Sequence, residues 1–234
     1  MAESDKLRIW LTRSEPGASR QSRELRAAGY DVWLAPVLEV EPTAPRAPAS
    51  AADIVVFLSE HAVLFTGDLT FCEHAQVFAL GRRTQEVLAE RGIHSTAPED
   101  ATSEGLLALR EFADVAGQRV VLVAGEGGRE HLLQALRAGG AMVTRRACYR
   151  RFAADDVQVD VAAIDAILAA SGDGATLVAR VWFPAGGRAD IPLLVPSQRV
   201  VEIAGDAGFT RVVLCSGADS AAWLEALANL CKTS

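Results

Sequence analysis

The sequence lacks several features that mark specialised classes of protein. Cys72, Cys148, Cys215 and Cys231 are its four cysteines, and they are widely spaced with no Cys-x-x-Cys pair. Scattered thiols of this kind predict reduced packing residues in a cytoplasmic protein rather than a disulfide scaffold. No hydrophobic run approaches the roughly 18 residues that a membrane helix needs. The first residues also lack the basic and apolar pattern of a signal peptide, so we expect no membrane partner and no secretion.

Charge and motif content exclude further classes. The formal net charge is −7 at pH 7, which argues against a nucleic-acid partner. The four histidines show no ligand spacing and no Gly-x-Ser-x-Gly motif is present, so neither a metal site nor a serine hydrolase is predicted. The segment from Gly125 to Arg129 does not continue as a dinucleotide-binding loop, because residue 130 is Glu. We therefore expect no cofactor, and any substrate must bring much of its own reactivity.

Short apolar segments alternate with helical ones along the 234 residues. A strand is predicted over Leu7–Thr12, then a helix that Ser14 caps and that ends near Ala28, then a strand over Tyr30–Leu34. This alternation is typical of parallel sheets with helices on their faces. The length suits one large domain or two of about 110 residues.

An internal duplication is the most informative feature of the sequence. Strand-like segments and the turns after them recur in the second half of the chain at a nearly constant offset. The matching pairs are Leu7–Thr12 with Arg119–Ala124, Asp53–Ser59 with Asp165–Ser171, Phe78–Thr84 with Leu194–Val200, and Ser103–Leu109 with Ser220–Ala226. The chain is therefore expected to fold as two similar lobes.

Parallel sheets bind ligands beyond the carboxyl ends of their strands, so the residues that follow each strand are candidates for a site. Ser59 and Ser171 each end an apolar strand and precede a helix. Each serine can either cap its helix only or also leave backbone N–H groups for an anion. Arginine greatly outnumbers lysine, and guanidinium groups suit carboxylate recognition, although solvated surface arginines are the plainer interpretation. These features favour two lobes that close on a small, carboxylate-rich molecule.

Motifs along almost the whole chain resemble those of the uroporphyrinogen-III synthase family, in the same order. They are Leu11–Arg13, Phe57–Val63, Ala79–Thr84, Ser103–Leu106, Gly125–Arg129, Cys148–Arg150 and Val195–Val200. The resemblance implies an α/β fold of two similar doubly wound, flavodoxin-like parallel-sheet lobes joined by two crossing segments. Residues 1–38 and 152–234 would form a discontinuous terminal lobe and residues 41–149 a middle lobe, with linkers near 38–41 and 148–152.

The resemblance also implies a reaction. Linear hydroxymethylbilane, which carries eight carboxylates, would lose its terminal hydroxyl as water and close with inversion of the last pyrrole ring, giving uroporphyrinogen III. No cofactor or metal is implied. The small-molecule substrate could be handed over by hydroxymethylbilane synthase, and the protein would be a cytoplasmic monomer. A non-catalytic two-lobed sensor or carrier is the alternative, and a nucleotide-binding regulator is a third interpretation.

Site residues follow from the family's motifs. Tyr149 is the expected catalytic proton donor, although a tyrosine packed at a lobe junction is an equally simple interpretation. Val200 lacks the hydroxyl expected in the terminal lobe, and Ser197 is the candidate to replace it. The expected substrate-binding residues are Arg13, Ser59, His61, Gly81, Thr84, Gly125, Arg129, Ser171, Gly172 and Ser197.

Overall fold

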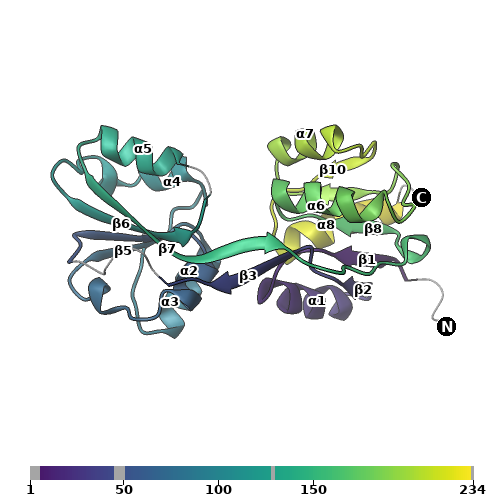
Figure 1. Ribbon diagram of the computed structural model, residues 1–234, viewed down its shortest axis with the longest axis horizontal. Coiled ribbons are helices and arrows are strands. Elements are labelled where there is room, and N and C mark those ends of the chain that lie inside the picture. The colour runs from purple at the N-terminus through teal and green to yellow at the C-terminus, as the bar shows by residue number, and fades with distance from the viewer. Residues whose placement is uncertain (1–5, 45–50, 128–129, 233–234) are drawn as a thin grey trace. The chain divides into compact units, whose positions relative to one another are not determined.

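A computed structural model describes residues 6–44, 51–127 and 130–232. The chain divides into two compact units (Figure 1). Met1–Val40 and Phe152–Ser234 form the terminal lobe, and Glu41–Arg151 forms the middle lobe. The chain passes between the lobes twice, in strand β3 (Leu38–Pro42) and in strand β7 (Met142–Ala153).

The terminal lobe contains a five-stranded parallel sheet with the order β10-β9-β8-β1-β2. Its strands are β1 (Arg8–Leu11), β2 (Asp31–Leu34), β8 (Ala166–Leu168), β9 (Leu193–Val195) and β10 (Val212–Leu214). Its helices are α1 (Gly17–Ala27), η4 (Val161–Ala163), α6 (Gly172–Trp182), α7 (Gln198–Asp206) and α8 (Ser220–Lys232).

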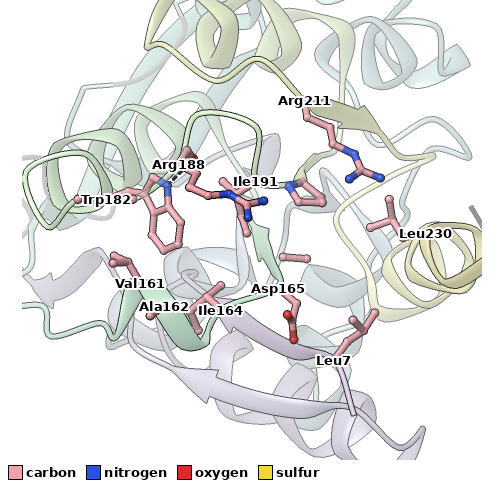
Figure 2. A pocket seen from close by; sticks show the side chains of 14 residues that line it. Leu7, Val161, Ala162, Ile164, Asp165, Trp182, Arg188, Ile191, Arg211 and Leu230 are labelled. Atoms are coloured by element: carbon pink, nitrogen blue, oxygen red, sulfur yellow. Dashed lines mark hydrogen bonds between the residues drawn. The ribbon is translucent and has the colours of Figure 1, made fainter. Parts of the chain in front are cut away.

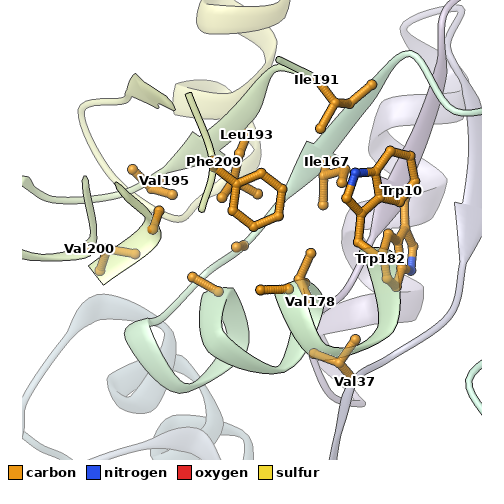
Figure 3. Close-up of a cluster of buried hydrophobic side chains, with 14 of the residues drawn as sticks. Trp10, Val37, Ile167, Val178, Trp182, Ile191, Leu193, Val195, Val200 and Phe209 are labelled. Atoms are coloured by element: carbon orange, nitrogen blue, oxygen red, sulfur yellow. The ribbon is translucent and has the colours of Figure 1, made fainter. Parts of the chain in front are cut away.

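Both faces of this sheet are covered by helices, because successive strand residues point to opposite faces. On one face Trp10 packs with Val178 of α6 in a cluster of buried side chains (Figure 3). On the other face Ile9 packs with Leu25 of α1 and Trp223 of α8. The predicted doubly wound lobe is confirmed here.

The middle lobe holds the second sheet, with the order β3-β7-β6-β4-β5. Its remaining strands are β4 (Ile54–Phe57), β5 (Gln76–Ala79) and β6 (Arg119–Gly125). Its helices are α2 (Glu60–Phe65), η2 (Thr70–Cys72), α3 (Arg82–Glu90), α4 (Ser103–Leu107), η3 (Arg110–Phe112) and α5 (His131–Ala138). Strands β4 to β7 pair in parallel, whereas β3 runs antiparallel to β7, since Thr43 N–H donates to Cys148 O and Ala154 N–H donates to Val37 O.

The duplication is visible in the order of the strands. The run β5-β4-β6-β7 in the middle lobe matches β9-β8-β1-β2 in the terminal lobe. A parallel bridge between Phe78 and Thr96 occupies the place that β10 takes beside β9. An aspartate also precedes the second strand of each pair: Asp53 accepts the backbone N–H of Arg119, and Asp165 accepts that of Arg8, both at 2.8 Å.

One local prediction was wrong. Ser14 does not cap the first helix, which begins at Gly17 after Pro16 and has no side-chain cap. Instead the carbonyl oxygen of Ser14 accepts the backbone N–H of Ala18 at 3.1 Å, so the serine satisfies the helix start through its backbone. In the described residues, no helix is long and apolar enough to cross a membrane.

The Asp53–Arg119 pair gives the middle lobe a defined response to acid. Hydrogen bonds from Arg119 lower the pKa of Asp53 from 3.8 to about 2. A lowered pKa stabilises the fold above pH 3.8, and this contribution is lost as the pH falls through about 2. We expect Asp53→Asn to lower the urea midpoint of unfolding at pH 7 and to change it much less at pH 2.

The matched control for this prediction is Glu99→Gln, which removes an exposed carboxylate of the same lobe. Asn keeps an oxygen that can accept the N–H of Arg119, so Asp53→Asn removes the charge and little else. Equal midpoints for Asp53→Asn and the unchanged chain at pH 7 would contradict the assignment.

Candidate functional site

Two hydroxyl groups meet where strands β4 and β7 of the middle lobe end. The Ser59 hydroxyl caps helix α2 by accepting the backbone N–H of Ala62 at 3.1 Å. The same oxygen lies 2.9 Å from the phenol oxygen of Tyr149. Because either hydroxyl can donate in this bond, the pair can pass a proton from one oxygen to the other. The predicted capping by Ser59 is confirmed, and the bond to Tyr149 is additional.

Aromatic rings surround the Tyr149 phenol. The ring centroid of His61 lies 5.5 Å from that of Tyr149, and that of Phe65 lies 6.3 Å away. His61 and Phe65 are stacked on each other, as expected for residues four apart on one helix. Tyr149 is only 7% exposed, so its hydroxyl lies in surroundings that screen charge weakly. Sequence reasoning did not single out Phe65, although its spacing from His61 carried the signal.

A register shift sets the position of Tyr149. Strands β6 and β7 pair regularly up to Ala124 and Ala147, and then Gly125 lies opposite Tyr149 rather than Cys148. The backbone N–H of Glu126 donates to the carbonyl oxygen of Tyr149 at 2.7 Å and fixes this arrangement. A single extra residue on one strand re-aims the side chains that follow it. The irregularity therefore directs the phenol towards Ser59.

Gly125 leaves the space that the Tyr149 ring fills. A Cβ atom built at Gly125 would lie 2.6 Å from Cε2 of that ring, closer than carbon atoms approach one another. The carbonyl oxygen of Gly125 accepts the Arg145 guanidinium at 2.8 Å. Gly125 thus serves the position of Tyr149 directly. Arg129, the other residue expected from this turn, lies outside the described residues.

The terminal lobe repeats the serine without the tyrosine. Ser171 caps helix α6 by accepting the backbone N–H of Gly174 at 3.1 Å. In the part of the chain that the structure describes, its hydroxyl has no tyrosine partner. A Cβ at Gly172 would lie 2.6 Å from Cδ1 of Ile203, so this glycine allows helices α6 and α7 to pack closely. The duplicated device is thus a capped helix start, and the hydroxyl pair is peculiar to the middle lobe.

Two further helices begin without a side-chain cap. Gly81 precedes α3 and Ser197 precedes α7, and neither helix start receives a hydrogen bond from a capping side chain. Thr84 and Val200, which hold corresponding places in the first turns, are 5% and 2% exposed. Their side chains belong to the core, so a hydroxyl at residue 200 would offer little to a ligand. The expected compensation by Ser197 is therefore unnecessary, and Thr84 can serve a ligand mainly through its backbone N–H.

The clustered arginines are largely engaged within the protein. Arg13 follows β1 and donates to the carbonyl oxygen of Ala218 at 3.3 Å, beside Gln21, which donates to the same oxygen at 2.7 Å. Arg146 is 8% exposed, and it donates to the hydroxyl and the carbonyl oxygen of Thr66 at the C-terminal end of α2, both at 3.4 Å. A cation is favoured at that end of a helix.

Other arginines of these clusters pair with carboxylates: Arg82 with Glu86, Arg83 with Glu60, and Arg150 with Glu41. The interpretation that most of these arginines are solvated surface groups was wrong, because several hold loops and helix ends in place.

The cysteines and acidic groups offer no alternative chemistry. Burial raises the pKa of Cys72, Cys148 and Cys215 to about 11, so these thiols stay protonated at neutral pH. Cys148 donates weakly to the carbonyl oxygens of Ala62 and Ala124. Among the described residues, no group of three or more His, Cys, Asp and Glu side chains could hold a metal ion. The hydroxyl pair is the group of residues best placed for proton transfer.

The two capping serines allow a matched test of this geometry. Ser59→Ala removes a helix cap and also leaves the buried Tyr149 hydroxyl without its partner, so we expect a loss of about 2 kcal/mol of stability. Ser171→Ala removes the cap alone and should cost about 1 kcal/mol. Urea unfolding of both variants measures the difference. Equal losses would show that the bond between Ser59 and Tyr149 contributes nothing.

Comparison with known proteins places this fold and site in a family. The family model described as uroporphyrinogen-III synthase HemD matches residues 19–225. Uroporphyrinogen-III synthase of Escherichia coli (strain K12) is 29% identical over 244 residues, covering 94% of this chain and 99% of the relative. The enzyme of Salmonella typhimurium is 31% identical over 253 residues, with the same coverage of both chains.

Solved structures agree on the fold. A mutant uroporphyrinogen III synthase from the extremely thermophilic bacterium Thermus thermophilus superposes with a TM-score of 0.62 at 14% identity, over 97% of this chain and 100% of that one. Uroporphyrinogen-III synthetase from Helicobacter pylori 26695 gives a TM-score of 0.65 at 11% identity, over 96% and 99% of the two chains. Together with the duplicated sheets and the hydroxyl pair, these matches show that the chain belongs to the uroporphyrinogen-III synthase family.

Proposed function

We propose that the chain catalyses its family's cyclisation of hydroxymethylbilane, with Tyr149 as the proton donor to the departing hydroxyl. The observation that carries this assignment is the 2.9 Å contact between the Tyr149 and Ser59 hydroxyls beside the aromatic rings of His61 and Phe65. The family match disfavours the non-catalytic sensor or carrier.

The geometry gives each hydroxyl a role. As the terminal C–O bond breaks, the Tyr149 O–H donates its proton to the leaving oxygen, which departs as water. The Ser59 hydroxyl then donates to the phenolate oxygen, while its own oxygen keeps the N–H of Ala62 as a donor. Donors fixed in advance stabilise charge without reorganisation, which is the usual source of such rate enhancement. The positive azafulvenium left on the substrate carbon is captured by a pyrrole carbon of the same molecule.

Helix starts would bind the substrate's carboxylates. In the middle lobe these are the first-turn N–H groups of α3, after Gly81, including that of Thr84. In the terminal lobe they are the turns at Ser171–Gly172 and at Ser197, together with Arg13. Hydrogen bonds from such donors to a carboxylate are worth roughly 1.5–3 kcal/mol each. Holding the flexible chain in one conformer would select ring inversion over simple closure.

Further features complete the proposal. We include a monomeric state, a cytoplasmic location and direct transfer of the reactive substrate from hydroxymethylbilane synthase. Closure of the lobes on the ligand, and contacts from Gly125 and Arg129, also stay predictions.

An isomer-resolved assay tests the proposed function. Hydroxymethylbilane is supplied to the purified chain, and the cyclised products are oxidised and separated by isomer. We expect the inverted isomer to dominate at catalytic amounts of protein. Formation of only the uninverted isomer at saturating protein would overturn the proposal and would favour a binding protein instead.

A further inference from the structure

A second potential site lies at the opposite edge of the terminal-lobe sheet. A cavity of about 690 Å³ opens at the amino ends of strands β8 and β9, between Asp165 and Ile191 (Figure 2). Ser171 and Ser197 follow the carboxyl ends of these same strands, so the residues proposed to bind substrate do not line the cavity. A role for this space is independent of the proposed function.

The apolar part of the cavity is preformed. Val161, Ile164 and Ile191 line it together with the indole of Trp182, which is only 1% exposed overall. The indole N–H donates to the carbonyl oxygen of Arg188 at 2.9 Å and fixes the turn that follows α6. Gly187 lies flat against the same ring, since a Cβ there would be 2.3 Å from it. The wall is therefore held in place by its own contacts.

Charges at the rim favour an anion. Arg188 and Arg211 both line the cavity (Figure 2). Arg188 pairs with Asp190 at 2.9 Å, but this pair is largely exposed and therefore weak. Within the described ranges, the Arg211 side chain has no hydrogen bond or ion pair. The carboxylate of Asp165 is engaged by the backbone N–H of Arg8 at 2.8 Å.

We propose that this cavity binds a small aromatic monocarboxylate, with its rings against Trp182 and Ile191 and its carboxylate on Arg211 and Arg188. The volume lies in the range of pockets that hold small organic ligands. A planar guanidinium binds a carboxylate through two parallel hydrogen bonds, and aromatic faces pack well on an indole. The combination of an apolar wall and two guanidinium groups distinguishes such a ligand from a neutral or cationic one.

Titration with 2-naphthoate tests the proposal on the full chain labelled with ¹⁵N. The indole N–H signal of Trp182 should shift saturably in two-dimensional NMR spectra, while that of Trp223, on the other face of the sheet, should not move. Arg211→Gln should weaken binding about tenfold, as expected for the loss of a charge-assisted bond. Arg23→Gln, on the exposed side of α1, is the matched control and should bind like the unchanged chain.

The outcomes are distinct. Arg188→Gln provides a second variant at the rim and should also weaken binding. Absence of a saturable Trp182 shift at millimolar naphthoate would overturn the proposal. Equal affinity for the neutral 2-naphthamide, or unchanged affinity in both arginine variants, would overturn it as well. The cyclisation assay reads a different set of residues, so failure of either idea leaves the other standing.

Discussion

Tyr149→Phe should lower kcat for formation of the inverted isomer by about a hundredfold while the protein stays folded. The loss corresponds to the lower range for removal of a general acid. Phe keeps the ring that packs beside His61 and Phe65 and fills the space at Gly125, so KM should change little. Quenched single time points, with the products separated by isomer, measure both the rate and the isomer ratio.

The second tyrosine of the chain supplies the control. Tyr30→Phe removes a phenol hydroxyl in the terminal lobe, next to strand β2, and should leave kcat within twofold of the unchanged chain. The share of the uninverted isomer should rise with Tyr149→Phe only, because the substrate closes without inversion when the protein does not act on it. Retention of full kcat in Tyr149→Phe would show that the hydroxyl is dispensable and that the residue packs only.

Much of the fold could be predicted from local sequence. Apolar strands ending in Ser59 and Ser171 predicted capped helices in both halves, and both caps are present. The repeated order of segments predicted two similar sheets, because each repeat unit pairs its strands in the same way. Such features depend on short spacings and on turn chemistry, which neighbouring residues determine.

The candidate site depended on information that local sequence does not hold. The bond between Ser59 and Tyr149 joins residues far apart in the chain and requires a register shift opposite Gly125. Strand register is set by the pairing of whole strands, and one residue of slip exchanges the side chains on a face. Burial of Arg146 was likewise missed, since arginines are mostly exposed unless a partner such as the end of α2 satisfies them.

Gly125→Ala should have an effect comparable with loss of the phenol itself. The new methyl group would lie 2.6 Å from the Tyr149 ring, so the ring must move and its contact with Ser59 is lost. We expect kcat to fall at least tenfold and stability to fall by about 1–3 kcal/mol, as for other overpacked sites. Steady-state kinetics and urea unfolding measure the two effects. Gly205→Ala is the control, because a Cβ at that helical position meets no atom within 4 Å and should be neutral or stabilising.

A double variant separates displacement of the hydroxyl from general damage. If Gly125→Ala acts by moving the Tyr149 hydroxyl, then adding it to Tyr149→Phe should lower kcat little further, since the group it displaces is already absent. Stability should still fall, because Phe occupies the same space beside Gly125 as the tyrosine ring does. Fully additive losses in kcat would mean that the turn at Gly125 contributes to catalysis independently of Tyr149. Coupled rates with separate stability effects would instead connect the glycine to the reaction through the placement of a single oxygen atom.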